Sequence, residues 1–144
     1  MKRIFLIALT AIILLTGCTS EPKQVLAIRA VAFYMTKEQV RYIEGSSITQ
    51  EYALCFELSD IEMFGLNTEI VYGFDDSSDS GRLTSIEIRF DPDLPDSEIF
   101  EAVNAEWGTE FSEENTMDSF TVGETSFSCL YSETQKCIDI RSPY

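Results

Sequence analysis

Residues 70–90, IVYGFDDSSDSGRLTSIEIRF, contain two apolar runs that flank a short polar run. The large apolar residues are Ile70, Tyr72 and Phe74 before the polar run and Leu83, Ile86, Ile88 and Phe90 after it. Their period of two predicts two β-strands, each with one buried face. The polar run, residues 75–81, predicts a hairpin loop between the two strands.

Upstream, a third strand is predicted from an alternation formed by Tyr52, Leu54, Phe56 and Leu58. Further upstream, apolar residues 25–35 lack clean periodicity, so the choice between strand and helix stays open there. We take the end of that segment, residues 32–34, as extended.

A short helix is predicted to begin at Thr36 and to end before Gly45. Thr36 and Gln39 fit a capping box, in which the hydroxyl and the amide side chain each satisfy a terminal backbone N–H. Val40 and Ile43 are expected to form the inward apolar stripe. Gly45 suits the positive φ that commonly ends a helix.

A second helix is predicted from Asp96 to Trp107, with Asp96 as its cap and Glu98 in its first turn. Its apolar stripe consists of Ile99, Phe100, Val103 and Trp107. Gly108 is expected to stop the helix. Three further strands are expected, at residues 118–122, 125–132 and 136–141.

The two halves of the chain share a plan of helix, glycine and three strands. In both halves a valine lies five residues before the glycine, which indicates a degenerate internal duplication with halves at about 35–90 and 91–144. The sequence thus predicts a single α+β domain over residues 25–144. In that domain, two helix-plus-three-strand units form antiparallel sheet packed on helices.

The N-terminus has the pattern of an export signal, because Lys2 and Arg3 precede an apolar run over residues 4–15. A run of 12 residues is too short to cross a bilayer, because a membrane-spanning helix needs about 20. The run ends in Leu15-Thr16-Gly17-Cys18, which resembles the lipobox of bacterial lipoproteins.

The lipobox resemblance implies a diacylglycerol thioether on Cys18, cleavage of residues 1–17, and acylation of the new amino group by a fatty acid such as palmitate. Residues 18–24 would then be the lipidated N-terminus and a polar tether. The membrane is therefore one expected partner, contacted through the lipid on Cys18.

A second resemblance lies in residues 35–45, MTKEQVRYIEG, which are similar to the helix motif of small outer-membrane assembly lipoproteins of the BamE/OmlA type. The β-lactamase-inhibitor-protein family carries a similar motif in tandem. The matching positions are Met35, Thr36, Gln39, Val40, Ile43 and Gly45. Tyr34 stands where those families have glycine, and Glu44 stands where they have leucine. The resemblance implies a repeated fold of helix plus antiparallel sheet, but it transfers no partner-contact residue.

Charge and composition narrow the classes of function. The formal charge of −15 becomes −17 when the signal takes away Lys2 and Arg3. Such a surface repels nucleic acids and anionic headgroups, so we expect no nucleic-acid partner and attachment through lipid alone. The chain has no histidine, which excludes His-based triads and His metal ligands. With no catalytic constellation in the sequence, we expect neither enzymatic activity nor a cofactor.

Residues 76–87, DSSDSGRLTSIE, approach the spacing of a calcium-binding EF-hand loop, with Asp76 first and Glu87 twelfth. However, serines replace two of the usual ligands, and the flanking segments have the pattern of strands rather than helices. We therefore expect a plain hairpin loop and no metal site.

Three cysteines remain besides Cys18. A disulfide between Cys129 and Cys137 in the last hairpin stays open. Matching the apolar faces pairs Cys129 with Ile138 instead, so the bridge would need a bulge. Cys55 is expected to be a small, buried or half-buried residue rather than a reactive thiol.

Residues 91–135 contain twelve Asp or Glu and no Lys or Arg. We expect a solvated acidic surface, with docking of a basic envelope or secreted protein as the functional alternative. The sequence thus predicts a lipid-anchored, non-enzymatic binding or scaffolding protein on the extracytoplasmic side of a cell membrane or outer membrane. The alternative is an inhibitor of a secreted or envelope hydrolase, by analogy with the tandem inhibitor fold.

Overall fold

The computed structural model describes residues 27–122 and 125–143. The export signal, Cys18 and the polar tether lie outside these residues. What the sequence indicates about them therefore stays a prediction.

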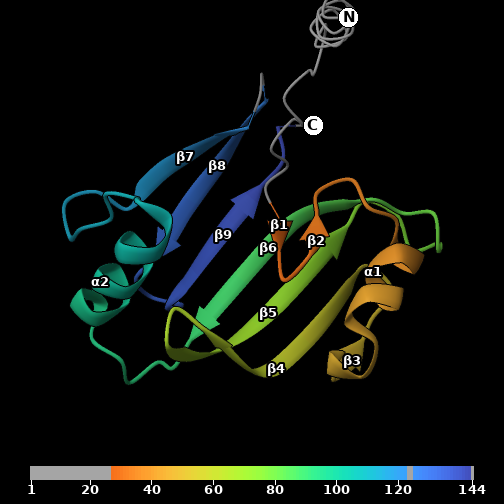
Figure 1. Cartoon of the computed structure of the whole chain (residues 1–144), viewed down its shortest axis with the longest axis horizontal. Coiled ribbons are helices and arrows are strands. Elements are labelled where there is room, and N and C mark those ends of the chain that lie inside the picture. The colour runs from red at the N-terminus through yellow and green to blue at the C-terminus, as the bar shows by residue number, and fades with distance from the viewer. Residues whose placement is uncertain (1–26, 123–124, 144) are drawn as a thin grey trace, which may run out of the picture.

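The described chain is built around a seven-stranded antiparallel sheet (Figure 1). Its strands are β3 (Gln50–Glu51), β4 (Cys55–Met63), β5 (Leu66–Phe74), β6 (Leu83–Phe90), β7 (Met117–Val122), β8 (Thr125–Ser132) and β9 (Cys137–Arg141). They lie in the order β3-β4-β5-β6-β9-β8-β7, so the pairing of β6 with β9 joins the two halves of the chain. One face of the sheet is covered by α1 (Lys37–Glu44), α2 (Asp96–Trp107) and the small hairpin of β1 (Ala27–Ile28) and β2 (Val31–Ala32).

The predicted α+β fold of two helix-plus-three-strand units is wrong, because the structure is mostly β-sheet. The two α-helices have 8 and 12 residues against seven strands in the sheet. The first half of the chain contributes four strands to that sheet, and two of them, β4 and β5, form a long hairpin. Its turn contains Phe64 and Gly65, both with positive φ. This turn was missed because the sequence there carries neither Asn-Gly nor Asp-Gly.

The predicted strand over residues 52–58 is displaced along the chain. The structure places β3 before it and begins β4 only at Cys55. As a result, Tyr52 and Leu54 are exposed, although the alternation had placed both on the buried face. Phe56 and Leu58 are fully buried as predicted.

The core consists of rows of side chains that run across the strands on the helix-covered face. One row follows the register from Phe56 through Tyr72 and Ile86 to Ile140, and all four side chains are fully buried. The alternations in residues 70–74 and 83–90 are confirmed by this register. The opposite face of the sheet is polar and carries ion pairs, for example between Arg89 and Glu87.

Helix α1 forms as predicted at both ends. Thr36 caps it, and both hydrogen bonds of the capping box with Gln39 are present. Gly45 follows with a φ of 50°. Val40 is fully buried, but the prediction that Ile43 points inward is wrong, because Ile43 is 38% exposed.

Helix α2 has the predicted bounds and buries Ile99, Phe100 and Val103 against the sheet. Trp107, at the end of the stripe, is half-buried and packs edge-on against Phe64, with ring centroids 4.8 Å apart. This contact ties the end of α2 to the turn of the β4–β5 hairpin.

The ends of α2 differ in how well they were predicted. Gly108 ends the helix in the left-handed conformation, as expected. Asp96 does not cap the helix, because Pro95 occupies the N-cap and makes no side-chain cap bond. Instead, Asp96 Oδ1 accepts hydrogen bonds from the Tyr131 hydroxyl and from Lys136 Nζ, each at 2.5 Å.

In the segment left open by the sequence, residues 27–28 and 31–32 form strands. The expectation that residues 32–34 are extended is wrong for Phe33 and Tyr34, which lie in a turn where Tyr34 has a φ of 67°. β1 and β2 pair as a hairpin whose turn contains Arg29 and Ala30, both with positive φ. Val31 and Phe33 are buried, and the Phe33 ring packs against the Phe127 ring of β8 with centroids 4.8 Å apart. The hairpin therefore lies on the same face of the sheet as the two helices.

Candidate functional site

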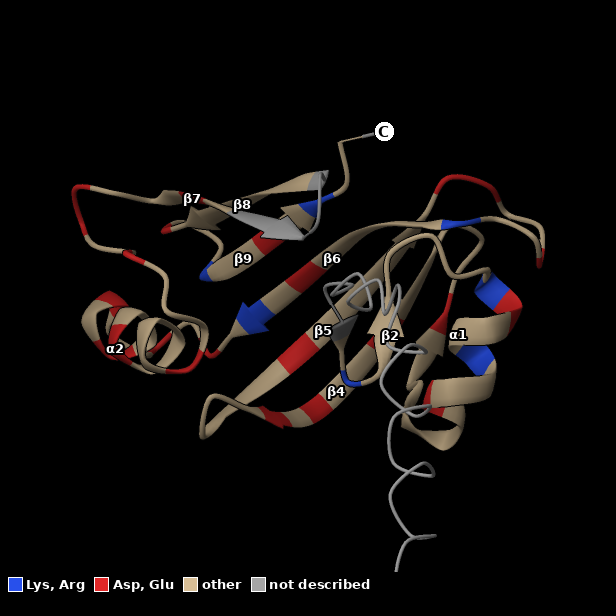
Figure 2. Ribbon diagram, turned by 45° about the horizontal axis from the view of Figure 1, so that its top comes forward, with Lys and Arg blue, Asp and Glu red and all other residues tan. Residues whose placement is uncertain are grey.

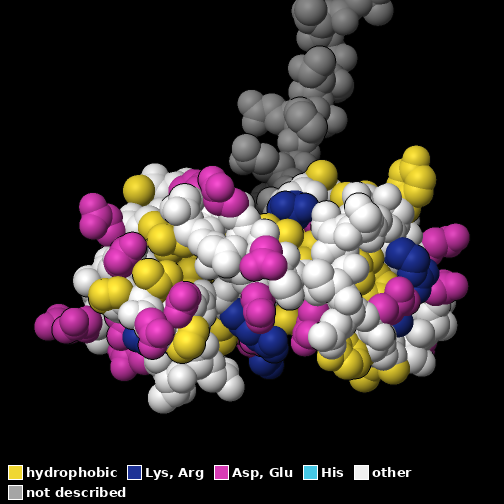
Figure 3. Space-filling view, turned by 90° about the horizontal axis from the view of Figure 1, so that it is seen from below, with side chains coloured by type: hydrophobic (Ala, Val, Ile, Leu, Met, Phe, Trp, Pro, Cys, Tyr) yellow, Lys and Arg dark blue, Asp and Glu magenta, His cyan; other side chains and the backbone are white. Residues whose placement is uncertain are grey.

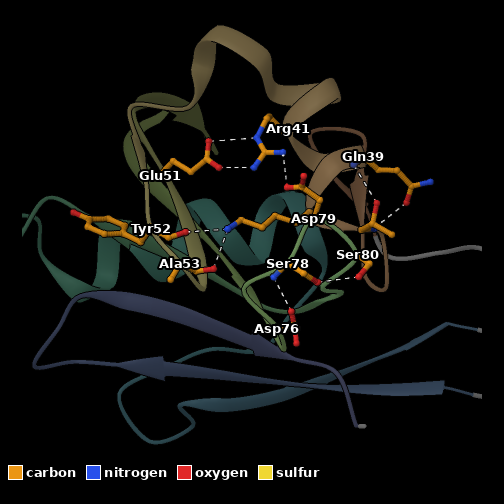
Figure 4. Close-up of polar contacts among 11 residues, drawn as sticks. Gln39, Arg41, Glu51, Tyr52, Ala53, Asp76, Ser78, Asp79 and Ser80 are labelled. Carbon is orange, nitrogen blue, oxygen red and sulfur yellow. Dashed lines mark hydrogen bonds and ion pairs between the residues drawn. The ribbon is translucent and has the colours of Figure 1, made fainter.

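Polar and charged side chains contact one another where α1, the β3–β4 connection and the 75–82 loop meet (Figure 4). Lys37, on the inner side of α1, is 4% exposed. Its Nζ donates hydrogen bonds to the carbonyl oxygens of Tyr52 at 3.1 Å and Ala53 at 2.9 Å, and it lies 5.2 Å from the centroid of the Phe56 ring. This buried cation is satisfied by two carbonyls and a ring face, so it fixes α1 to the sheet edge.

Arg41 lies one turn further along the same side of α1. Its guanidinium forms ion pairs with Glu51 and, at 3.1 Å, with Asp79, and it also stacks over Phe56. Hydrogen bonds to these carboxylates raise the pKa of Arg41, and the guanidinium lowers the pKa of Glu51. Arg41 thereby connects β3, α1 and the 75–82 loop.

The 75–82 loop is a hairpin loop, as the sequence predicted, and its backbone docks on the start of α1. The carbonyl oxygens of Gly81 and Asp79 accept hydrogen bonds from the N–H groups of Lys37 and Glu38 at 2.8 and 3.1 Å. Gly81 is required by close approach, because a Cβ there would lie 2.2 Å from the carbonyl oxygen of Asp76. The loop thus satisfies two backbone donors at the helix N-terminus.

The side chains of the EF-hand-like segment are already engaged with other groups. Asp76 Oδ1 accepts a hydrogen bond from the Ser78 N–H at 2.6 Å, and the hydroxyls of Ser78 and Ser80 bond each other at 2.8 Å. Glu87 lies on the polar face of the sheet, paired with Arg89. Within residues 27–122 and 125–143, no three His, Cys, Asp or Glu are grouped to hold a metal ion.

A second buried polar cluster joins the end of α1 to the β1–β2 turn. Glu44 Oε1 accepts a hydrogen bond from the Tyr72 hydroxyl at 2.8 Å, and Glu44 Oε2 lies 3.1 Å from the Arg29 guanidinium. Burial, followed by the hydrogen bond to Glu44, raises the pKa of the Tyr72 hydroxyl. Glu44 is therefore a buried carboxylate whose two partners hold three separate elements together.

We expect Tyr72→Phe to destabilise the domain by about 1–3 kcal/mol, because the buried Glu44 carboxylate loses a donor that no solvent can replace. Chemical denaturation followed by circular dichroism measures this loss. Tyr42→Phe is the matched control, since Tyr42 is 90% exposed and should change stability by less than about 0.5 kcal/mol. Equal stabilities for the two variants would contradict a structural role for the Glu44 cluster.

Sequence reasoning missed Lys37 and Glu44 because it searched α1 for an apolar stripe. Both residues are on the face of Val40, at spacings of three and four residues from it. That spacing was a usable signal. The partners that satisfy the two charges are distant in sequence, so the helical period could not show that these charges would have hydrogen-bond partners when buried.

The outer side of α1 carries an apolar surface that the sequence did not predict. Tyr42 is 90% exposed, and Met35 and Ile43 lie beside it. Together with Glu38 and Gln39 they line a shallow hollow of about 350 Å³. We call these five residues the α1 outer face.

The cysteines do not form a reactive pair. Cys129 lies opposite Ile140, rather than the predicted Ile138, whereas Cys137 lies opposite Ser132. The structure therefore places the two thiols on different rungs and opposite faces, and both are free. Burial raises the pKa of Cys129 to about 12 and that of Cys137 to about 11. Thiols this weakly acidic stay protonated at neutral pH and are poor nucleophiles.

The acidic segment faces solvent, as the α2 stripe predicted. Nine of its described carboxylates are exposed, and they belong to Asp91, Asp93, Glu98, Glu101, Glu106, Glu110, Glu113, Glu114 and Glu133. Figure 2 shows Asp and Glu on α2 and no Lys or Arg. In Figure 3, many carboxylates lie on the surface at the same end of the molecule. Among the described residues of this segment, Asp96 forms an ion pair, with Lys136 at 2.5 Å.

The Asp96 contacts give a pH dependence. Hydrogen bonds from Lys136 and Tyr131 lower the pKa of Asp96. A lowered pKa contributes stability above the unfolded-state value of about 3.9, and this contribution is lost as the pH falls through the folded-state value. We expect the difference in unfolding free energy between wild type and Asp96→Asn to shrink as the pH falls from about 5 to below the lowered pKa of Asp96. A difference in unfolding free energy that stays constant over this pH range would contradict the proposed role of the Asp96 contacts. Lys136→Met should also reduce this difference, because it removes one partner of Asp96.

In comparisons with known proteins, no family model, no curated protein and no solved structure matches this chain. The resemblances to lipoproteins and to the BamE/OmlA-type motif therefore stay predictions. Among the residues that the structure describes, no helix is long and apolar enough to span a membrane.

Proposed function

We propose that this protein is a lipid-anchored extracytoplasmic lipoprotein with a non-enzymatic binding or scaffolding role. The main support for the proposal is the sequence Leu15-Thr16-Gly17-Cys18. It ends a short apolar run that follows two basic residues, Lys2 and Arg3. In this proposal, the lipid on Cys18 holds the domain at a membrane from which its net charge would otherwise repel it.

The described ionisable groups support binding rather than catalysis. The buried Lys37 and Glu44 are occupied in holding α1 to the sheet. Cys129 and Cys137 are buried protonated thiols. The ionisable groups that face solvent are mainly carboxylates, and in this proposal they recognise a partner.

The proposed location is the outer membrane where the cell has one, and otherwise the outer leaflet of the cell membrane. Thr19 follows the proposed lipidated cysteine, so the aspartate that retains lipoproteins at the inner membrane is not present there. The proposed partner is a basic envelope or secreted protein, because α2 exposes the carboxylates of Glu98, Glu101 and Glu106, which are more numerous than the nearby cations. Screening within about 8 Å at physiological salt keeps the repulsion among these carboxylates modest.

Affinity capture from detergent-solubilised envelopes tests the proposed role. Recovery of a structural envelope protein with a basic surface would support scaffolding. A captured secreted or envelope hydrolase whose activity falls on binding would support the inhibitor alternative instead. A captured acidic protein, bound with no dependence on salt, would contradict the proposed docking surface.

We expect the triple reversal Glu98→Lys, Glu101→Lys and Glu106→Lys to slow association with a captured partner several-fold while leaving the fold intact. Reversal of Asp60, Glu62 and Glu69 to Lys is the matched control, because it changes the net charge equally at other exposed positions. Association rates from surface plasmon resonance at two salt concentrations measure the effect. Equal slowing in both triple variants would assign the effect to net charge and would contradict docking on α2.

A further inference from the structure

The α1 outer face is an apolar surface whose exposure has no structural explanation within the described domain. Tyr42, at 90%, is the most exposed of the large apolar side chains, and Ile43 is 38% exposed. Tyr34, just before the helix, adds a further exposed ring at 36%. Removing these side chains from water is favourable, so a surface that displays them together suits a contact.

The C-terminal end of α1 lies close to the β1–β2 turn, near the start of the described chain. The described chain begins at Ala27, and two residues later Arg29 contacts Glu44, which follows Tyr42 and Ile43 in α1. Residues 19–26 separate Cys18 from Ala27, and eight residues span at most about 28 Å. A lipid on Cys18 would therefore hold this part of the domain near the bilayer.

The distribution of charge along the chain also favours the α1 end as the one that faces the membrane. Residues 27–45 carry three cations, Arg29, Lys37 and Arg41, and two anions, Glu38 and Glu44. All the rest of the described chain is strongly acidic, and α2 carries no Lys or Arg. The carboxylates of Glu51 and Asp79 pair with Arg41 beside α1, so the α1 end is less acidic than the α2 end and not basic. Anionic headgroups would therefore repel the α2 end more strongly than the α1 end.

A basic group that contacts the Tyr34 backbone fits the same orientation. The guanidinium of Arg82 donates a hydrogen bond to the Tyr34 carbonyl at 2.9 Å, and both side chains are exposed. Tyrosine and arginine side chains are favoured at the headgroup level, where the ring meets the acyl boundary and the charge meets phosphate. The combination of Tyr34, Tyr42 and Arg82 matches the chemistry of a membrane interface.

We propose that the α1 outer face rests on the bilayer to which the protein is anchored, with the acidic α2 end directed away from it. This inference rests on the proposed lipid anchor at Cys18. The contact would fix one orientation of the domain, and it would leave the carboxylates of α2 free for a partner in the surrounding compartment.

Depth-dependent quenching of a tryptophan tests this orientation. The full-length lipidated protein carries Trp107→Phe and one new tryptophan, either Tyr42→Trp on the α1 outer face or Ala105→Trp on the exposed side of α2. Each variant is reconstituted into vesicles of phosphatidylethanolamine and phosphatidylglycerol with brominated acyl chains. We expect at least about a twofold loss of emission for the tryptophan at position 42, and no loss at position 105.

The outcomes separate the orientation from the anchor. Protein that floats with the vesicles but shows no quenching at position 42 would overturn the orientation and leave the anchor standing. Protein that does not float would overturn the anchor and the orientation together. A blue-shifted but unquenched signal at position 42 would mean that a second copy covers this face, which also overturns the proposal. If Trp107→Phe fails to fold, the same substitutions are measured with Trp107 kept and its parent signal subtracted.

Discussion

Val103→Asp is expected to destabilise the domain by about 4 kcal/mol, enough to unfold much of the population at physiological temperature. Val103 is fully buried on the inner face of α2, between Ile99 and Trp107 in the helical stripe. A carboxylate at this position would lose its hydration and gain no cation, so it would either stay charged at great cost or bind a proton. Thermal melts followed by circular dichroism measure the loss.

Ala105→Asp is the control for Val103→Asp, because Ala105 lies in the same helix but is exposed. Its effect should stay within about 0.5 kcal/mol, which separates the cost of burial from the cost of added negative charge. A melting temperature for Val103→Asp equal to that of Ala105→Asp would refute the packing of α2 on the sheet.

Cys18→Ser is expected to abolish lipid attachment completely. The hydroxyl cannot replace the thiol in forming the diacylglyceryl thioether, and lipoprotein-type cleavage before residue 18 depends on that modification. The variant should therefore lack palmitate label and run as an unprocessed precursor. Metabolic labelling with radioactive palmitate, followed by immunoprecipitation, measures both effects.

Cys55→Ser provides the control for lipid labelling. Cys55 lies on β4 within the domain, and its substitution should leave both labelling and processing intact. Persistent labelling of Cys18→Ser would show that lipid is attached elsewhere, and the lipobox interpretation would then be wrong.

The sequence predicted features that depend on neighbouring residues. The capping box of Thr36 and Gln39 and the stop at Gly108 were both correct, since each involves residues within one helical turn. The strands of residues 70–90 were also correct, because alternation over a long run leaves only one choice of buried face.

The sequence failed where distant partners decide the outcome. Asp96 looked like a helix cap, but its carboxylate pairs with Lys136, which lies 40 residues further along the chain. Ile43 looked like a core residue, but the inner face of α1 is filled by Lys37 and Glu44, whose charges are satisfied by groups on other elements. The mostly β architecture was missed because the turn between two long strands, at residues 64–65, has the sequence Phe-Gly, which is not a typical hairpin signal.

The α1 outer face is a further feature that the sequence alone could not predict. A helical wheel displays Tyr42, but it does not show that Ile43 and Met35 gather beside it on the outside of the domain. That arrangement follows from which side of α1 Lys37 and Glu44 bind to the sheet. The tertiary contacts of buried charges thus determine which apolar residues remain for a partner surface.

Mass spectrometry of the mature protein, isolated from its own membrane, tests whether a lipid anchors the chain at Cys18. We expect a chain that begins at Cys18, with a diacylglyceryl group on the thiol and a fatty acid on the amino group. A mature chain that begins at any other residue, or that carries an unmodified Cys18 thiol, would contradict it.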